Sequence, residues 1–203
     1  MRGIFCIETA CWTSRESGRG KHPAVQPSVR PILQLITALQ GTPCIHRRFT
    51  TAEQLQRLLR LATSPRYGAF PVIYVACHGE TQRLSLRRAG ARGRERSLRL
   101  DELAQPLAGR GAGKLMVFSA CRFMRGSRRT LGRFVRDTGV EALMGYERDV
   151  GWLESAQLEL GLLAALTREA PPDARALPAT LRALPSARDL MRHLDFRVVP
   201  RLD

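Results

Sequence analysis

The chain has 203 residues, of which 44% are hydrophobic and 25% charged, which fits one globular domain and excludes a disordered or fibrous chain. Its 33 basic and 18 acidic residues give a net charge of +15, which favours a polyanionic partner. All but two of the basic residues (Lys21 and Lys114) are arginines, however, and codon drift in a GC-rich genome produces the same bias.

Short β-prone segments alternate with longer segments of helical periodicity along most of the chain. Continuous apolar runs predict strands at residues 3–7, 42–46, 70–77, 115–120 and 142–144. Apolar residues at helical spacing predict helices at residues 29–40, 50–62, 130–137 and 152–168, the second begun by a capping box of Thr50 and Glu53. Strands that are apolar on both faces are typical of a sheet with helices on both sides.

One connection departs from this alternation, after the third predicted strand. Residues 83–88 and 96–100 alternate polar with apolar side chains around a turn with Gly90 and Gly93. This pattern predicts an exposed β-hairpin inserted before a short helix at residues 101–107.

The carboxyl-terminal part of the chain differs from the rest in composition. Residues 169–203 begin with a proline-rich segment and continue with a short predicted helix at 187–193 and a last strand at 196–199. The element order predicts one α/β domain over residues 1–203 with its core in 1–168. We expect a mostly parallel, doubly wound sheet of about six strands with helices on both faces.

No predicted segment has the properties of a membrane span. The longest apolar run, residues 158–166, contains Glu159 and Gly161 and is much shorter than the roughly 18 residues that a span requires. The apolar stretch near the amino terminus is interrupted by Glu8, which makes it too short for a secretory signal. We therefore expect a cytoplasmic protein.

The cysteines are odd in number and lie in mostly apolar surroundings, which argues against a disulfide framework. No pair of cysteines or histidines has the spacing of a zinc finger, so we expect no metal site and no cofactor. The five cysteines are Cys6, Cys11, Cys44, Cys77 and Cys121.

Two predicted strands end in reactive side chains, since one leads into His78 and Gly79 and the other into Cys121. The carboxyl ends of parallel strands meet at one edge of a sheet, so these residues can converge on one crevice. An imidazole there can take the proton of the thiol, and the backbone N–H groups of Gly79 and Cys121 are natural donors to an oxyanion. The alternative is that Cys121 is a small core residue and His78 a polar residue at a strand end.

The arrangement resembles the caspase-fold cysteine peptidases of clan CD, which include caspases, metacaspases, separases and the bacterial CHAT proteases. The resemblance rests on a strand ending in His78-Gly79, an inserted hairpin and helix, and a strand ending in Ala120-Cys121-Arg122. The caspase signature is Q-A-C-[RQG]-G with a histidine about 50 residues upstream. Here the histidine lies 121 − 78 = 43 residues upstream.

The chain also departs from caspases proper. Ser119 replaces the signature glutamine and Phe123 replaces the glycine, so the substrate preference of caspases is not implied. The hairpin, together with residues 144–152, is more similar to the CHAT-like bacterial branch. The resemblance covers roughly residues 1–168.

The resemblance implies a caspase-like three-layer sandwich and a role for each of the motif residues. Cys121 would be the nucleophile, His78 the general base or ion-pair partner and Gly79 an oxyanion donor, with no metal. Glu8 and Asp149 follow the first and fifth strands and are candidates to line an acidic pocket for a basic substrate side chain. A helix cap or an ion pair with an arginine explains each of them as well.

The expected function is limited proteolysis of a protein partner. Small bacterial members of this group resemble proteases that activate a pore-forming effector, such as a gasdermin, in anti-phage defence. The alternative is a nucleic-acid-binding α/β module without catalysis, which would use the arginines of the hairpin and of residues 122–136. That alternative explains the charge but not the pair of His78 and Cys121, and its basic segments lack interleaved aromatic residues for base stacking.

Overall fold

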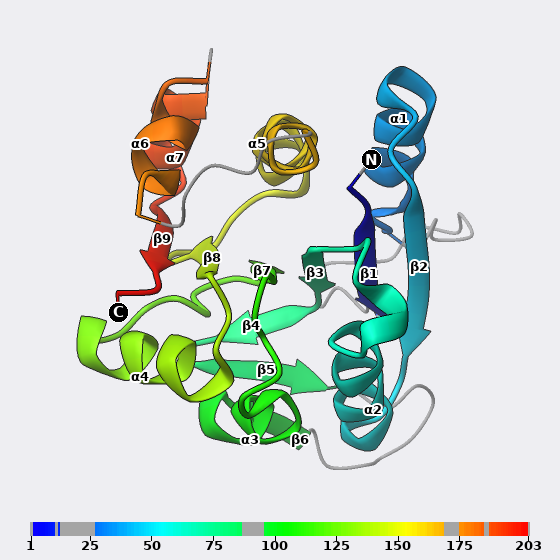
Figure 1. Cartoon of the computed structure of the whole chain (residues 1–203). Helices are drawn as coiled ribbons and strands as arrows, with labels where there is room; N and C mark the ends of the chain where they lie inside the picture. Colours follow the sequence, from blue (N-terminus) through cyan, green and yellow to red (C-terminus); the bar gives the residue numbers. More distant parts are fainter. Residues whose placement is uncertain are drawn as a thin grey trace, which may run out of the picture.

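The computed structural model describes residues 2–10, 12, 27–86, 96–168, 175–184 and 187–202 of the chain. Its main sheet has six strands with helices on both faces (Figure 1). The strands are β1 (Ile4–Thr9), β2 (Cys44–Phe49), β3 (Val72–Ala76), β7 (Leu115–Ser119), β8 (Ala142–Tyr146) and β9 (Phe196–Pro200). The helices are α1 (Arg30–Gln40), α2 (Ala52–Ala62), α3 (Leu100–Ala104), α4 (Arg128–Thr138), α5 (Trp152–Leu166), α6 (Leu177–Arg182) and α7 (Ala187–His193), with 3-10 turns at Pro65–Tyr67 and Gln105–Leu107.

The strand order is β2-β1-β3-β7-β8-β9, and only β9 runs antiparallel to its neighbour. The order reverses between β1 and β3, which makes the sheet doubly wound. The predicted mostly parallel sheet of about six strands is therefore confirmed. In the described part of the chain, no helix combines the length and the apolar character that crossing a membrane requires.

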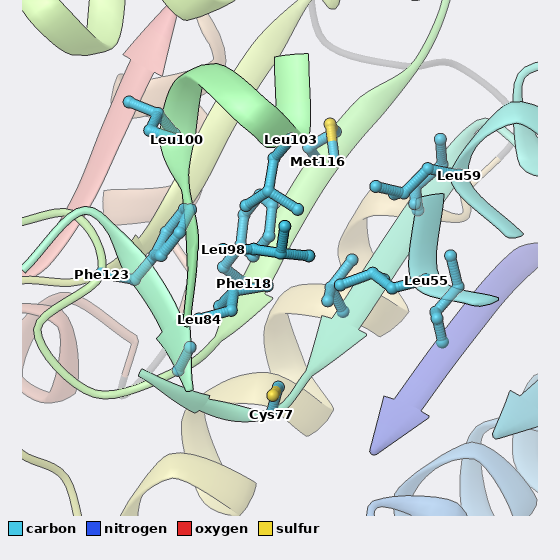
Figure 2. Close-up of a cluster of buried hydrophobic side chains, with 14 of the residues drawn as sticks. Leu55, Leu59, Cys77, Leu84, Leu98, Leu100, Leu103, Met116, Phe118 and Phe123 are labelled. Atoms are coloured by element: carbon cyan, nitrogen blue, oxygen red, sulfur yellow. The ribbon is translucent and has the colours of Figure 1, made fainter. Parts of the chain in front are cut away.

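Alternating side chains of the strands build two hydrophobic cores, one on each face of the sheet. In β3, Ile73 and Val75 point into the first core, whereas Val72 and Tyr74 point into the second. The first core is completed by α2, α3 and α4 and the second by α1, α5, α6 and α7. Figure 2 shows part of the first core.

The start of α2 differs by one residue from the predicted capping box. Thr51, not Thr50, is the N-cap, and its side chain accepts a hydrogen bond of 3.2 Å from the backbone N–H of Gln54. The Gln54 side chain in turn accepts from the backbone N–H of Thr50 at 2.8 Å. The predicted capping box of Thr50 and Glu53 is therefore wrong by one residue. Gln54 holds the third helical position, where glutamine can accept the hydrogen bond as well as glutamate can.

The inserted hairpin is a three-stranded antiparallel sheet of β4 (His78–Glu80), β5 (Arg83–Leu86) and β6 (Arg96–Arg99). Its description as exposed is wrong, because Leu84, Leu86 and Leu98 are buried in the first core. Figure 2 shows Leu84 and Leu98 within this cluster. The predicted turn with Gly90 and Gly93 lies outside the described residues.

A buried carboxyl group joins α5 to the sheet within the second core. The side chain of Glu159 is buried and accepts hydrogen bonds from the hydroxyls of Tyr74 (2.5 Å) and Tyr146 (2.9 Å). Burial raises the pKa of Glu159 above its ordinary value of 4.5, although the hydroxyls act in the opposite direction. Glu159 therefore ties β3 and β8 to α5 near the carboxyl ends of the strands.

The raised pKa of Glu159 predicts how its contribution to stability changes with pH. Folding favours the protonated form, so its contribution is full below about pH 4.5 and falls as the pH rises through the folded-state pKa. We expect the unfolding free energy of the wild type, minus that of Glu159→Gln, to fall between pH 4 and 7, by about 1.4 kcal/mol per unit of pKa shift. Urea denaturation at each pH measures this difference.

The exposed Gln157 of the same helix provides the control, since Gln157→Ala replaces one side chain without a titratable group by another and should give a difference from wild type that does not vary with pH. A difference for Glu159→Gln that rises with pH would show that the folded protein binds the carboxylate form instead.

Candidate active site

The register of two neighbouring strands determines where the predicted reactive residues leave the sheet. Ala76 at the end of β3 pairs with Ser119 at the end of β7, and the backbone N–H of Cys77 extends the ladder by donating to the Ser119 carbonyl at 3.2 Å. His78 lies two residues after Ala76, and Cys121 lies two residues after Ser119. The two segments therefore leave the same edge of the sheet from adjacent strands.

Gly79 brings the segment after β3 into contact with the segment after β7. A Cβ atom at position 79 would lie 2.5 Å from the carbonyl oxygen of Cys121 and 2.8 Å from the Cβ of Ala120. The backbone N–H of Gln82 also donates to the carbonyl of Phe123 at 3.3 Å. Only glycine permits this approach, which places the backbone of β4 against the backbone of the cysteine.

The chain turns sharply after Cys121. Arg122 has a φ of 54°, in the left-handed region that residues other than glycine rarely adopt. Its backbone N–H donates to the carbonyl of Arg148 at 3.0 Å, and its Nε lies 2.9 Å from Oδ1 of Asp149. Further along, the N–H of Met124 donates to the carbonyl of Tyr146 at 2.9 Å. These bonds hold the loop against the segment after β8.

Cys121 is half-buried and carries a free thiol. Its Sγ lies 3.9 Å from the carbonyl oxygen of Val150, to which it is a weak donor. Burial raises the pKa of Cys121 above the ordinary value of 9.0, and the nearby Asp149 raises it further, whereas Arg122 lowers it. The residue is therefore a protonated thiol at neutral pH, and it needs a base to become a nucleophile.

An aromatic cluster borders the half-buried His78. The ring of Trp12 packs edge-to-face against the His78 ring, with centroids 5.1 Å apart, and also against the ring of Trp152, at 4.7 Å. Trp152 begins α5 two residues after Val150, and 43% of its surface is exposed. His78 therefore packs on Trp12, and the partner of Trp12, Trp152, follows the segment whose Val150 carbonyl lies near the Cys121 thiol.

Sequence analysis did not identify either tryptophan as part of the site. They are the only two tryptophans of the chain, and they follow the ends of predicted strands by five residues (Trp12) and eight residues (Trp152). Their scarcity and position are the signal that could have singled them out.

Glu8 is buried at the end of β1, and both of its carboxylate oxygens accept hydrogen bonds. Burial alone would raise the pKa of Glu8, but these hydrogen bonds outweigh it and lower the pKa below 4.5. One donor is the indole of Trp12, so Glu8 holds the ring that packs on His78. The donors among the described residues are Trp12 Nε1 (2.9 Å) and Val29 N (2.9 Å) on Oε1, and Ser28 Oγ (2.9 Å) and His46 Nε2 (2.7 Å) on Oε2.

The structure thus places His78, Gly79 and Cys121 at one edge of the sheet. Glu8 is hydrogen-bonded to the indole of Trp12, and Asp149 is on the loop beside Arg122. Glu8 is enclosed, whereas Asp149 is exposed and paired with an arginine. Their role in binding substrate stays a prediction. Among the described residues, no group of three or more histidine, cysteine or acidic side chains is placed to hold a metal ion.

The contact at Gly79 predicts a severe effect of a single methyl group. In Gly79→Ala the added Cβ meets backbone that cannot move without shifting Cys121, so we expect the reactivity of the Cys121 thiol to change at least tenfold and the protein to be destabilised by about 1–3 kcal/mol. Alkylation kinetics and urea denaturation measure the two effects.

Gly161→Ala in α5 is the matched control, because a Cβ there meets no described atom within 4 Å. It should leave the reactivity unchanged and stabilise the helix by about 0.5–1 kcal/mol. If the two variants show the same alkylation rate of Cys121 and the same change in unfolding free energy, the close approach at Gly79 does not position the cysteine.

Three comparisons relate the chain to known proteins. A search of curated proteins finds no match to the chain. Among solved structures, caspase-1 from Spodoptera frugiperda is similar at 14% sequence identity and a TM-score of 0.47, over 81% of this chain and 68% of the caspase chain. A family model described as "Family of unknown function (DUF6642)" matches residues 2–198. Because this match spans nearly the whole chain, the protein belongs to the DUF6642 family.

Proposed function

We propose that the protein is a cysteine endopeptidase in which Cys121 is the nucleophile and His78 the general base. The observation that carries the proposal is the contact of Gly79 with the Cys121 carbonyl, because it brings a histidine and a cysteine from separate strands to one edge of the sheet. The resemblance of the His78-Gly79 and Ala120-Cys121-Arg122 motifs to clan CD peptidases supports it.

The first half of the reaction forms a thioester. As Cys121 Sγ bonds to the carbonyl carbon of the scissile peptide, its proton passes to the imidazole of His78. The backbone N–H groups of Gly79 and Cys121 donate to the resulting oxyanion. The carbon–nitrogen bond then breaks, and the leaving amine takes the proton from the imidazolium of His78.

The second half regenerates the thiol. His78 removes a proton from a water molecule as the water oxygen attacks the thioester carbon, and the same N–H groups stabilise the second oxyanion. The carbon–sulfur bond breaks, Cys121 regains its proton, and the carboxylic acid product leaves. The raised pKa of Cys121 favours His78 as the base of the first step over His78 as the partner of a preformed thiolate.

The substrate in this proposal is a polypeptide that passes over the exposed start of α5. Trp152 and Leu153 expose 43% and 74% of their surfaces there, which offers apolar contact area. Asp149 on the exposed loop is the proposed acidic residue for a basic substrate side chain, and the enclosed Glu8 is proposed to hold Trp12 in place beside His78.

The physiological role that we propose is limited proteolysis of a protein partner in the bacterial cytoplasm. The resemblance to small bacterial CHAT-like proteases favours a pore-forming, gasdermin-like effector encoded nearby as that partner, in anti-phage defence. This role depends on the catalytic proposal and on the resemblance.

Selective alkylation tests the catalytic proposal. Cys44 is an internal control, since it is also half-buried, its pKa is also raised by burial, and we propose no base for it. We expect iodoacetamide to modify Cys121 at least tenfold faster than Cys44 at pH 7.5, because His78 supplies a base only to Cys121. Mass spectrometry of quenched samples gives the rate at each cysteine.

His78→Ala should bring the alkylation rate of Cys121 down to that of Cys44. It should also abolish cleavage of a mixed peptide library, as should Cys121→Ala. Equal rates at the two cysteines of the wild type, or library cleavage that survives in His78→Ala, would refute the proposed pair.

A further inference from the structure

Arginines from four elements line one groove at the edge of the main sheet, away from the catalytic pair. The groove runs along β9 between α4, which packs on the first core, and α6 and α7, which pack on the second (Figure 1). Its volume is about 1580 Å³. The arginines are Arg128, Arg129, Arg133 and Arg136 of α4, Arg182 of α6, Arg188 and Arg192 of α7, Arg197 of β9, and Arg201 directly after β9.

The charge of this arginine groove is poorly balanced by its own surroundings. Among the described residues, only Glu147 and Asp195 contribute carboxylates to the lining. Four of the nine arginines have an acidic partner within 4 Å: Arg136 with Asp137, Arg192 with Asp189, Arg197 with Glu147 and Arg201 with Glu141. The other five form no ion pair with any residue that the structure describes, and all five are exposed: Arg128, Arg129, Arg133, Arg182 and Arg188.

The arginines form rows along their elements. On α4, Arg129, Arg133 and Arg136 are spaced by four and three residues, which places them on one face of the helix. Arg188 and Arg192 repeat the spacing of four on α7, Arg197 lies on β9, and Arg201 follows the end of that strand. The groove thus presents regularly spaced positive charge on both sides of the strand.

Both the size of the groove and its chemistry restrict the occupant. Small-molecule pockets measure about 300–1,000 Å³, so the groove fits a polymer better. A guanidinium group binds phosphate through two parallel hydrogen bonds, and rows of arginines match a backbone whose charges recur at a fixed spacing. Phe196, the one aromatic residue of the lining in the described part of the chain, is buried and cannot stack on a base.

We propose that this groove binds nucleic acid through its phosphate backbone, without reading the base sequence. The five exposed arginines without an ion pair make the main phosphate contacts. The site involves neither Cys121 nor His78, so it does not depend on the peptidase proposal. It differs also from the surface expected from sequence, because the arginines of α4 act with those of α6, α7 and β9 rather than with those of the hairpin.

Fluorescence anisotropy with the full-length Cys121→Ala protein tests this proposal. The probes are a 20-base-pair DNA duplex, the RNA duplex of the same sequence and the single DNA strand, each titrated at several salt concentrations. For duplex DNA held by five phosphate contacts, we expect log K to fall with log salt with a slope of about −4.5. Binding of any of the three probes supports the proposal, and their relative affinities identify the preferred form.

A matched pair of triple variants locates the binding. Replacing Arg129, Arg133 and Arg188 by glutamine should weaken binding more than tenfold and reduce the slope by about 2.7. Replacing Arg30, Arg57 and Arg60 by glutamine removes the same charge from exposed positions outside the groove and should change affinity less than threefold. Circular dichroism confirms that both variants are folded.

Three outcomes would overturn the proposal. They are absence of binding at low salt, equal weakening by the two triple variants, and binding of poly-glutamate as tight as that of the nucleic acids at equal charge concentration. The last outcome would assign the groove to an acidic polypeptide. None of them bears on the alkylation of Cys121, so the two proposals fail separately.

Discussion

The pairing of Ala76 with Ser119 is the constraint on which the rest of the candidate site depends. Because β3 and β7 are parallel and in this register, the two residues that follow each strand emerge at the same level of the sheet. A shift by one residue would turn the side chains of one strand to the opposite face and separate His78 from Cys121. The hydrogen bonds of Glu159 with Tyr74 and Tyr146 reinforce the alignment from within the second core.

The strands were predictable because they depend on local composition. The position of the His78-Gly79 and Ala120-Cys121-Arg122 motifs at the ends of two of these strands followed from the same patterns. A run such as residues 70–77 is apolar at every position and fits only a strand buried on both faces, so the sheet and the order of its elements followed. The burial of Leu84 and Leu98 was not predictable, because alternation gives a strand one apolar face without saying what covers it. The contacts of Trp12 with His78 and Trp152 join segments far apart in the chain, and nothing local encodes them.

The net charge of the chain also could not be assigned to a surface from the sequence alone. The arginines of α4 form a basic segment that is visible in the sequence, but those of α7 and β9 follow it by about 60 residues and are separated by acidic and apolar positions. Only the antiparallel addition of β9 to β8 brings these groups together. The total charge therefore gives little information about a partner, whereas the positions of the arginines in the fold define the arginine groove as one basic surface.

The partial burial of Cys121 also affects how long the protein survives in an oxidising environment. Peroxides attack the thiolate far faster than the thiol, and the raised pKa of Cys121 keeps the thiolate scarce until a base acts on it. Removal of that proton, as proposed for His78, would therefore also open Cys121 to oxidation to sulfenic and sulfinic acids. Partial burial, which limits access to the sulfur, and a nearby base, which yields the thiolate, thus act in opposite directions on the lifetime of the free thiol.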